Sequence, residues 1–249
     1  MSKKVKVNAS ILIIGNEILS GRTQDTNTST LAIWLNSIGV NVAEVRVIPD
    51  IENTIVETLN FLRSTYDYVF TTGGIGPTHD DITAQSVSKA FGIKYEVHKK
   101  AFKILETYYQ PGEFNEGRQK MAWMPENAKL ILNPTSGAPG FNVENVFSLP
   151  GVPSILKSML GGLTNEIVGG EPIKSLTISL KTVESEIANS LTKVQNDNKD
   201  VEIGSYPFFH AGKLGVSIVI RSEDQSKINN CNSQILKFVN EKNIEVVDR

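Results

Sequence analysis

One run of the sequence, residues 71–81, combines glycines with adjacent carboxylates. It reads Thr-Thr-Gly-Gly-Ile-Gly-Pro-Thr-His-Asp-Asp. Glycine has no Cβ and tolerates positive φ, so the backbone N–H groups of such a loop can approach an anion closely. A helix that begins after the loop adds its positive N-terminal end. The run therefore indicates a phosphate-binding loop, with a plain tight turn as the alternative, since short glycine motifs are weakly specific.

Two carboxylates, Asp80 and Asp81, stand at the end of this run. They would repel a polyanion unless a cation neutralised them, which makes a divalent metal such as Mg²⁺ a natural third component. Either residue can instead cap the following helix, because aspartate is favoured at a helix start by its hydrogen bonding and by the helix dipole. One of the pair can have this role alone, but the two cannot easily both cap.

Other candidate residues follow other predicted strands. Glu17 lies in the loop after the first strand, where a carboxylate can bind a metal, ribose hydroxyls or water. Asp50 ends the second strand and can also be a helix cap. Asn27 or Thr26 is a reasonable N-cap for the helix that they precede. His79 can donate a proton or bind phosphate, and its alternative is a solvent-facing loop histidine.

The elements that position these residues alternate between strand and helix. β-branched runs and 3.6-residue spacing predict strands over residues 5–14, 40–48, 66–71 and 146–149 and helices over 27–38, 51–64, 82–91 and 99–109. A β-α-β-α-β order predicts an α/β fold of three layers, with helices on both faces of a mostly parallel sheet. Ligands bind such sheets at the carboxyl ends of the strands, where the candidate loops collect.

A second, smaller domain is predicted after residues 160–172, a stretch with four glycines and a proline. We predict domains at 1–168 and 169–249. Strands over 173–180, 201–206, 214–220 and 244–247 alternate with helices over 184–194 and 226–240. This β-α-β-β-α-β order predicts a small ferredoxin-like α+β domain.

The bulk composition excludes several classes of partner. A net charge of -2 and a pI near 6.0 argue against nucleic acid or a membrane surface, which leaves a small molecule as the default. Cys231, the only cysteine, cannot form an internal disulfide and indicates a reducing cytoplasm. No apolar run approaches the roughly 20 residues of a spanning helix. The sequence therefore predicts a soluble, cytoplasmic protein.

Several of these motifs resemble a known family. Residues 72–77 with 81–83, 49–50 and 149–153 look like the molybdopterin-binding fold of the MogA, MoaB and gephyrin G-domain proteins. Residues 15–21, 25–27, 137–141 and 204–207 are similar to the N-terminal region of the CinA proteins. The molybdopterin-binding-like domain of eukaryotic FAD synthases belongs to the same branch. The resemblance spans nearly the whole chain and implies a sheet of the molybdopterin-binding type.

The resemblance implies metal-dependent chemistry on a phosphoanhydride. Asp50 and Asp81 match two aspartates that act with Mg²⁺ in the molybdopterin adenylyltransferases, and the CinA branch implies hydrolysis of a nucleotide pyrophosphate such as ADP-ribose or FAD. We expect Asp50, Asp81, Asp80 and Glu17 to be catalytic, with Asp50 and Asp81 as the metal ligands. Substrate and its phosphates are expected to contact Thr72, Gly73, Gly74, Gly76, Asn16, Asn27, Ser136, Gly137, Pro139, Gly140, Pro150 and Gly151.

Two departures from the family pattern limit what the resemblance implies. Ile75 stands where the molybdopterin enzymes commonly have threonine, which removes a hydroxyl from the loop. The larger CinA proteins carry a further deamidase domain that this sequence lacks, so no deamidase activity is expected. Molybdopterin adenylyl transfer in molybdenum cofactor biosynthesis, and binding of a nucleotide or pterin without turnover, stay open as alternatives. Relatives that are dimers or trimers imply a homo-oligomer.

Overall fold

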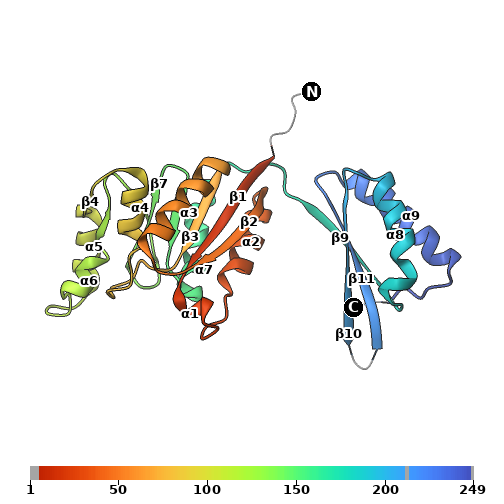
Figure 1. Ribbon diagram of the computed structural model, residues 1–249, viewed down its shortest axis with the longest axis horizontal. Helices are drawn as coiled ribbons and strands as arrows, with labels where there is room; N and C mark the ends of the chain where they lie inside the picture. Colours follow the sequence, from red (N-terminus) through yellow and green to blue (C-terminus); the bar gives the residue numbers. More distant parts are fainter. Residues whose placement is uncertain (1–5, 211–212, 248–249) are drawn as a thin grey trace. The chain divides into compact units, whose positions relative to one another are not determined.

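The computed structural model describes residues 6–210 and 213–247, which form two compact units (Figure 1). The first unit is Met1–Gly170 and the second is Glu171–Arg249. Part of the glycine-rich boundary stretch is helical, since α7 (Pro153–Leu163) includes Gly161 and Gly162. The later glycines close the first unit: a Cβ on Gly169 would lie 1.6 Å from a backbone oxygen of Ile38, and the N–H of Gly170 donates to Gly39 at 2.9 Å.

The first unit contains a six-stranded sheet in the order β2-β1-β3-β8-β7-β6. The strands β2 (Val40–Ile48), β1 (Val7–Ile14), β3 (Tyr68–Thr72) and β8 (Val146–Leu149) are mutually parallel. β7 (Gly140–Val143) runs antiparallel to β8, and β6 (Lys129–Ile131) runs antiparallel to β7 and therefore in the direction of the other four. The prediction of a mostly parallel sheet is confirmed. Val5, at the start of the first predicted strand, lies outside the described residues.

Helices cover both faces of this sheet (Figure 1). Alternate residues of β1 point to opposite faces, so Leu12 and Ile14 join one buried cluster while Ile11 and Ile13 join the other. The first cluster includes α3 (Glu52–Thr65) and α4 (Thr83–Phe91), and the second includes α2 (Asn27–Ser37) and α7. Burial on both faces explains why β1 reads as a continuous apolar run. Among the described residues, no helix is long and apolar enough to cross a membrane.

A group of short elements extends the first unit beyond the predicted pattern. It comprises α1 (Asn16–Leu19), β4 (Tyr95–Val97), α5 (Lys99–Tyr108), α6 (Glu116–Lys120) and β5 (Trp123–Pro125). Only α5 was predicted, because elements of three to five residues are too short for a period to be read from them. The α6 helix lies against the loop of residues 71–81, called the glycine loop from here on: a Cβ on Gly117 would be 3.4 Å from the backbone oxygen of Pro77.

The second unit has an antiparallel sheet in the order β10-β11-β9. Its elements are β9 (Lys174–Leu180), α8 (Glu184–Asp197), β10 (Glu202–His210), β11 (Lys213–Ser222) and α9 (Gln225–Glu241). The strand predicted over 244–247 is wrong in the described residues: Val246 makes one isolated antiparallel bridge with Leu180. Only Ile244 of that segment packs on the core, while Val246 is 49% exposed, so burial does not support a full strand.

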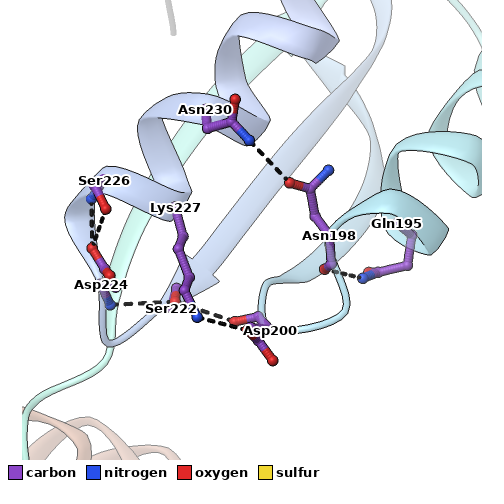
Figure 2. A network of polar contacts seen from close by, with 8 residues as sticks. All are labelled: Gln195, Asn198, Asp200, Ser222, Asp224, Ser226, Lys227 and Asn230. Carbon is purple, nitrogen blue, oxygen red and sulfur yellow. Dashed lines mark hydrogen bonds and ion pairs between the residues drawn. The ribbon is translucent and has the colours of Figure 1, made fainter.

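A polar network ties the loop after α8 to the start of α9 (Figure 2). Lys227 Nζ donates to Asp200 at 2.6 Å, and this bond holds the pKa of Asp200 below its ordinary value. Asp224 caps α9 by accepting from the Ser226 N–H at 2.8 Å and hydroxyl at 2.6 Å. Because its charged groups are satisfied by one another and by the helix end, we assign this network to holding the fold.

Candidate functional site

Four loops collect at one edge of the first unit's sheet, because β2, β1, β3 and β8 are neighbours and parallel. Backbone hydrogen bonds join adjacent loops where the strands end. The Gly15 N–H donates to Ile48 at 3.2 Å, and the Gly73 N–H donates to Leu149 at 3.1 Å. The sheet order therefore brings together the predicted residues from the segments around 16, 50, 73 and 150.

The glycine loop has a backbone that only glycine fits. Gly73 has φ 101° and Gly74 has φ 67°. A Cβ on Gly73 would lie 2.1 Å from the Ile14 oxygen, and one on Gly74 would lie 2.2 Å from Thr83 Oγ1. The Thr83 hydroxyl and N–H each donate at 2.9 Å, to the carbonyls of Gly73 and Gly74 respectively. These bonds fix the loop on the first turn of α4.

Three consecutive backbone N–H groups in the middle of the same loop are free to donate to a ligand. Within the described part of the chain, the N–H groups of Gly74, Ile75 and Gly76 make no hydrogen bond. All three residues are half-buried. Ile75 packs its side chain against the first core cluster, so it offers no polar group to a ligand. Adjacent free N–H groups at a helix start can hold a phosphate group.

Thr78 organises the two carboxylates at the end of this loop. Asp81 Oδ2 accepts from the Thr78 N–H at 2.8 Å and lies 2.5 Å from its Oγ1, which also lies 2.6 Å from Asp80 Oδ1. A hydroxyl has one proton and donates to one of the two carboxylates at a time. The Thr78 hydroxyl, followed by the backbone of Asp80 itself, holds the pKa of Asp80 below 3.8. The His79 side chain is 98% exposed, as in the solvent-facing alternative.

Asp50 and Glu17 lie at the two neighbouring strand ends. Asp50 Oδ2 accepts the Asn16 N–H at 2.8 Å, which ties the loop after β2 to the loop after β1. Glu17 folds back over Gly15, since its carboxylate oxygens would be 2.6 Å from a Cβ at that position. Asp50 is half-buried and Glu17 is exposed, so both carboxylates can meet a ligand at this edge.

The helix-cap alternatives for Asp50, Asp80 and Asp81 are wrong, whereas Thr26 is the N-cap of α2 as predicted. The N-caps of α3 and α4 are Ile51 and Ile82, and neither helix start has a side-chain cap bond from an aspartate. Thr26 is the N-cap of α2 but makes no side-chain cap bond, and Asp25 accepts the Asn27 N–H at 2.9 Å instead. The positions of Asp50, Asp80 and Asp81 therefore are not explained by helix capping.

Asn27 joins three of the four loops from a buried position. It is 6% exposed, and its Nδ2 donates to Thr72 Oγ1 at 2.9 Å and to the Gly151 carbonyl at 2.8 Å. The Thr72 hydroxyl donates in turn to the Pro150 carbonyl at 3.2 Å. Asn27 Oδ1 is buried without a hydrogen-bond partner among the described residues. The amide thus holds the loops and keeps one acceptor for a ligand or a water molecule.

Packing accounts for three of the four predicted contacts in residues 136–140. Gly137 has φ 75°, and a Cβ there would lie 2.7 Å from the Tyr108 ring. A Cβ on Gly140 would lie 2.4 Å from the Ser148 carbonyl of the adjacent strand. Ser136 Oγ accepts from Asn133 at 2.7 Å. Their contacts with substrate stay a prediction, whereas Pro139 lines a pocket with the glycine loop.

That pocket lies between the glycine loop and the segment from α6 to β5. Its walls include Gly74, Gly76 and Asp81 on one side and Lys120 and Trp123 on the other. Its volume is about 10 Å³, which is room for about one water molecule.

Two of these wall residues, Lys120 and Trp123, were not predicted as site residues. The Trp123 ring is 40% exposed and lies 5.5 Å from the Tyr95 ring, whose phenol has a pKa raised by burial. Lys120 and Trp123 lie outside every recognisable motif, so no local signal in the sequence marks them. Only their packing against the glycine loop does.

Asp50 and Asp81 are the two residues predicted to bind a metal ion. Among the described residues, no group of three or more His, Cys, Asp or Glu side chains is placed to hold a metal ion. Asp50 and Asp81 each use Oδ2 to accept a backbone N–H and keep Oδ1 available. Mg²⁺ is commonly bound by one or two carboxylates together with substrate phosphates. Each of the two side chains has one oxygen for this mode of binding, and a metal ion at this edge of the sheet stays a prediction.

Comparisons with known proteins agree with the motifs. Residues 10–169 match the family described as probable molybdopterin binding domain, and residues 172–248 match the FAD synthase middle domain. A protein from Archaeoglobus fulgidus is 33% identical over 233 residues, which are 93% of this chain and 98% of that protein. A CinA-like protein from Syntrophus aciditrophicus is 31% identical over 91% of this chain and 58% of its own length.

A solved structure shows the same likeness. The protein CinA from Thermoplasma acidophilum, described as being of unknown function, is 31% identical with a TM-score of 0.61. The match covers 65% of this chain and 99% of that one. The predicted resemblance to the MoaB, MogA and CinA proteins, and the predicted fold class, are confirmed.

Proposed function

The chain belongs to the family of probable molybdopterin binding domains and has CinA-like relatives, and on this premise we propose that it is a metal-assisted hydrolase of nucleotide pyrophosphates. The substrate class is a dinucleotide of the ADP-ribose or FAD type. In the reaction the oxygen of a water molecule bonds to one phosphorus and the P–O–P bond breaks. ADP-ribose then gives AMP and ribose 5-phosphate, and the proton of the attacking water passes to a carboxylate of the protein and from there to solvent.

The observation that carries this proposal is the pairing of free backbone donors with anchored carboxylates. The N–H groups of residues 74–76 offer hydrogen bonds to phosphate oxygens, and Asp81 follows in the same loop. Asp50 lies where β2 ends, in the same sheet, and its carboxylate accepts the Asn16 N–H from the loop after β1 at 2.8 Å. Phosphoryl transfer needs this combination, because its catalysis is mostly positioning and charge stabilisation.

Each side chain has a definite role in this proposal. Asp50 and Asp81 hold the cation with Oδ1, while Oδ2 fixes the carboxylate orientation. When bound, a divalent cation supplies positive charge that offsets the phosphate oxygens. Glu17, exposed over Gly15, accepts the proton of the attacking water, and Asp80 helps to fix Thr78.

Two observations favour a dinucleotide over molybdopterin. Ile75 contributes its side chain to the core, so the loop lacks the hydroxyl that the adenylyltransferase pattern has. The second unit matches the FAD synthase middle domain. A flavin or adenine dinucleotide as substrate therefore agrees with the family matches of both units, whereas molybdopterin agrees with the match of the first unit alone.

The test is a product assay with purified protein and defined variants. Protein is incubated with ADP-ribose, FAD, or ATP plus molybdopterin, with Mg²⁺, Mn²⁺ or EDTA, and AMP is measured by chromatography. We expect AMP from ADP-ribose or FAD with metal, and a loss of at least about a hundredfold in kcat/KM in Asp50→Asn and Asp81→Asn, the scale of removing an electrostatic catalytic group. Asp67→Asn is the matched control, since Asp67 also accepts a backbone N–H at 2.8 Å, from Asn8, but at the opposite end of β3.

The other functions predict different results in the same assay. Adenylyl transfer gives a pterin adduct from ATP and no AMP from the dinucleotides. A binding module gives affinity without turnover under every metal condition. Either result refutes the hydrolase, and so does full activity in both Asp50→Asn and Asp81→Asn.

A further inference from the structure

Lys120 is the cation of the pocket beside the glycine loop. Among the residues that line this pocket in the described chain, it alone has a positively charged side chain, and it shares the lining with Asp81 and Gly76. Its ammonium donates to the backbone carbonyl of Thr78. Lys120 is half-buried at the last position of α6, so its charge is held at the loop.

The other basic residue at this end of α6 is occupied elsewhere. The Arg118 guanidinium donates to the Glu113 carbonyl at 2.6 Å and lies 4.1 Å from the centre of the Tyr109 ring. It is therefore fixed against the α5–α6 connection. Lys120 instead donates to a single neutral carbonyl, which is a weak partner for an ammonium.

Lys120 supplies positive charge for a phosphate group, whereas the nearby carboxylates supply only negative charge. Asp80 and Asp81 place two negative charges at the end of the loop, beside the Thr78 residue that Lys120 contacts. A pyrophosphate at residues 74–76 would add further negative charge. A lysine binds phosphate as a mobile point charge, and its four-carbon stem lets the ammonium move from one oxygen to another.

We infer that Lys120 binds a phosphate group of a nucleoside pyrophosphate, exchanging the Thr78 carbonyl for a phosphate oxygen when the substrate enters the pocket. The inference rests on the proposed function for the identity of the ligand. The exchange moves the ammonium off the loop and widens a pocket that otherwise holds about one water molecule. Trp123, on the same wall, then lies beside the ligand.

Three substitutions separate the charge of Lys120 from its contact with Thr78. Lys120→Gln keeps a donor for the Thr78 carbonyl but has no charge, Lys120→Met has neither, and Lys120→Arg keeps the charge. We expect Gln and Met to raise KM for ADP-ribose about tenfold to a hundredfold, the scale of one charged hydrogen bond, with kcat changed less than about threefold. Arg should keep most of the affinity. Lys103→Met is the control, since Lys103 is an exposed lysine paired with Glu106 at 2.9 Å.

A binding measurement keeps this inference distinct from the hydrolase proposal. The Kd of ADP-ribose is measured in EDTA by calorimetry and by quenching of Trp123, at several NaCl concentrations. The wild type should lose affinity with salt more steeply than Lys120→Gln. If the wild type hydrolyses ADP-ribose and Lys120→Gln leaves KM and Kd unchanged, the role of Lys120 is refuted and the hydrolase stands.

The opposite combination, binding that depends on Lys120 without hydrolysis, also separates the two proposals. If no dinucleotide is hydrolysed but Lys120→Gln and Lys120→Met weaken ADP-ribose binding while Lys120→Arg does not, the hydrolase proposal fails and the phosphate contact stands. If all three variants lose affinity equally, neither the charge nor the Thr78 contact accounts for the loss, and the inference is wrong.

Discussion

Replacing Asn27 by alanine removes the hydrogen bonds that join three loops of the site. The amide donates to Thr72 Oγ1 at 2.9 Å and to the Gly151 carbonyl at 2.8 Å. Each such bond contributes about 1 kcal/mol net, so the variant should lose about 2 kcal/mol. Two features keep the loss from growing: Gly151 is exposed and its carbonyl can bind water, and the unpartnered Oδ1 is removed as well.

A second substitution at Asn27 sharpens the estimate. Asn27→Asp keeps the shape but replaces the donor by an acceptor that faces the Gly151 carbonyl, in a site that is 6% exposed. A buried carboxylate without a partner is costly, so Asp should destabilise more than Ala. Asn36→Ala is the control: it removes one bond to Ala32 at 2.8 Å within the same helix, and alanine is the better helix former.

Tryptophan fluorescence is the suitable assay, because both tryptophans, Trp34 and Trp123, lie in the first unit. Urea unfolding followed by this signal reports the unit that contains the site. A loss of about 2 kcal/mol corresponds to a fall in Tm of about 4–8 °C for a domain of this size. The expected order of destabilisation is Asp, then Ala, with Asn36→Ala near zero. A loss under about 0.5 kcal/mol in Asn27→Ala would refute the view that this amide joins the loops.

Three further predictions concern single positions. Gly73→Ala should lower the free energy of unfolding in urea by about 3 kcal/mol, because φ is 101° and the new Cβ would lie 2.1 Å from the β1 backbone. Gly92→Ala is the control, since φ is 66° but the space around it is open, and it should cost only about 1 kcal/mol. Equal losses in the two variants would contradict the packing argument. The Thr78 hydroxyl lowers the pKa of the Asp80 carboxyl from its ordinary value of 3.8, so the hydrogen bond between them is complete above that pH and is lost as the pH falls through the pKa of the folded state. Thr78→Ala should raise the pKa of Asp80 in an NMR titration, and an unchanged pKa would show that Thr78 is not the cause. Asp224→Ala removes the N-cap of α9 and should lower the urea midpoint of the second unit. Far-UV circular dichroism should report this change and tryptophan fluorescence should not, and a parallel change in both signals would contradict independent unfolding of the two units.

The sequence by itself determined the elements that are long and periodic. Leu31 and Leu35 recur at helical spacing and are buried in α2, and the apolar run of β1 is buried on both faces. Glycine at positions 73 and 74 permits the positive φ that the loop adopts there, because other residues rarely adopt it. These are local properties, and local properties can be read from neighbouring residues.

Only the tertiary structure decided which side chains meet. Asp50 reads locally as a helix cap, but the pairing of β1 with β2 gives it the Asn16 N–H as a partner. Gly140 reads as a ligand-binding glycine, but β8 packs against it. Lys120 belongs to no motif and reaches the site only because α6 packs on the glycine loop. Strand order and packing join residues that are distant in sequence, and no pattern of neighbouring residues specifies such contacts.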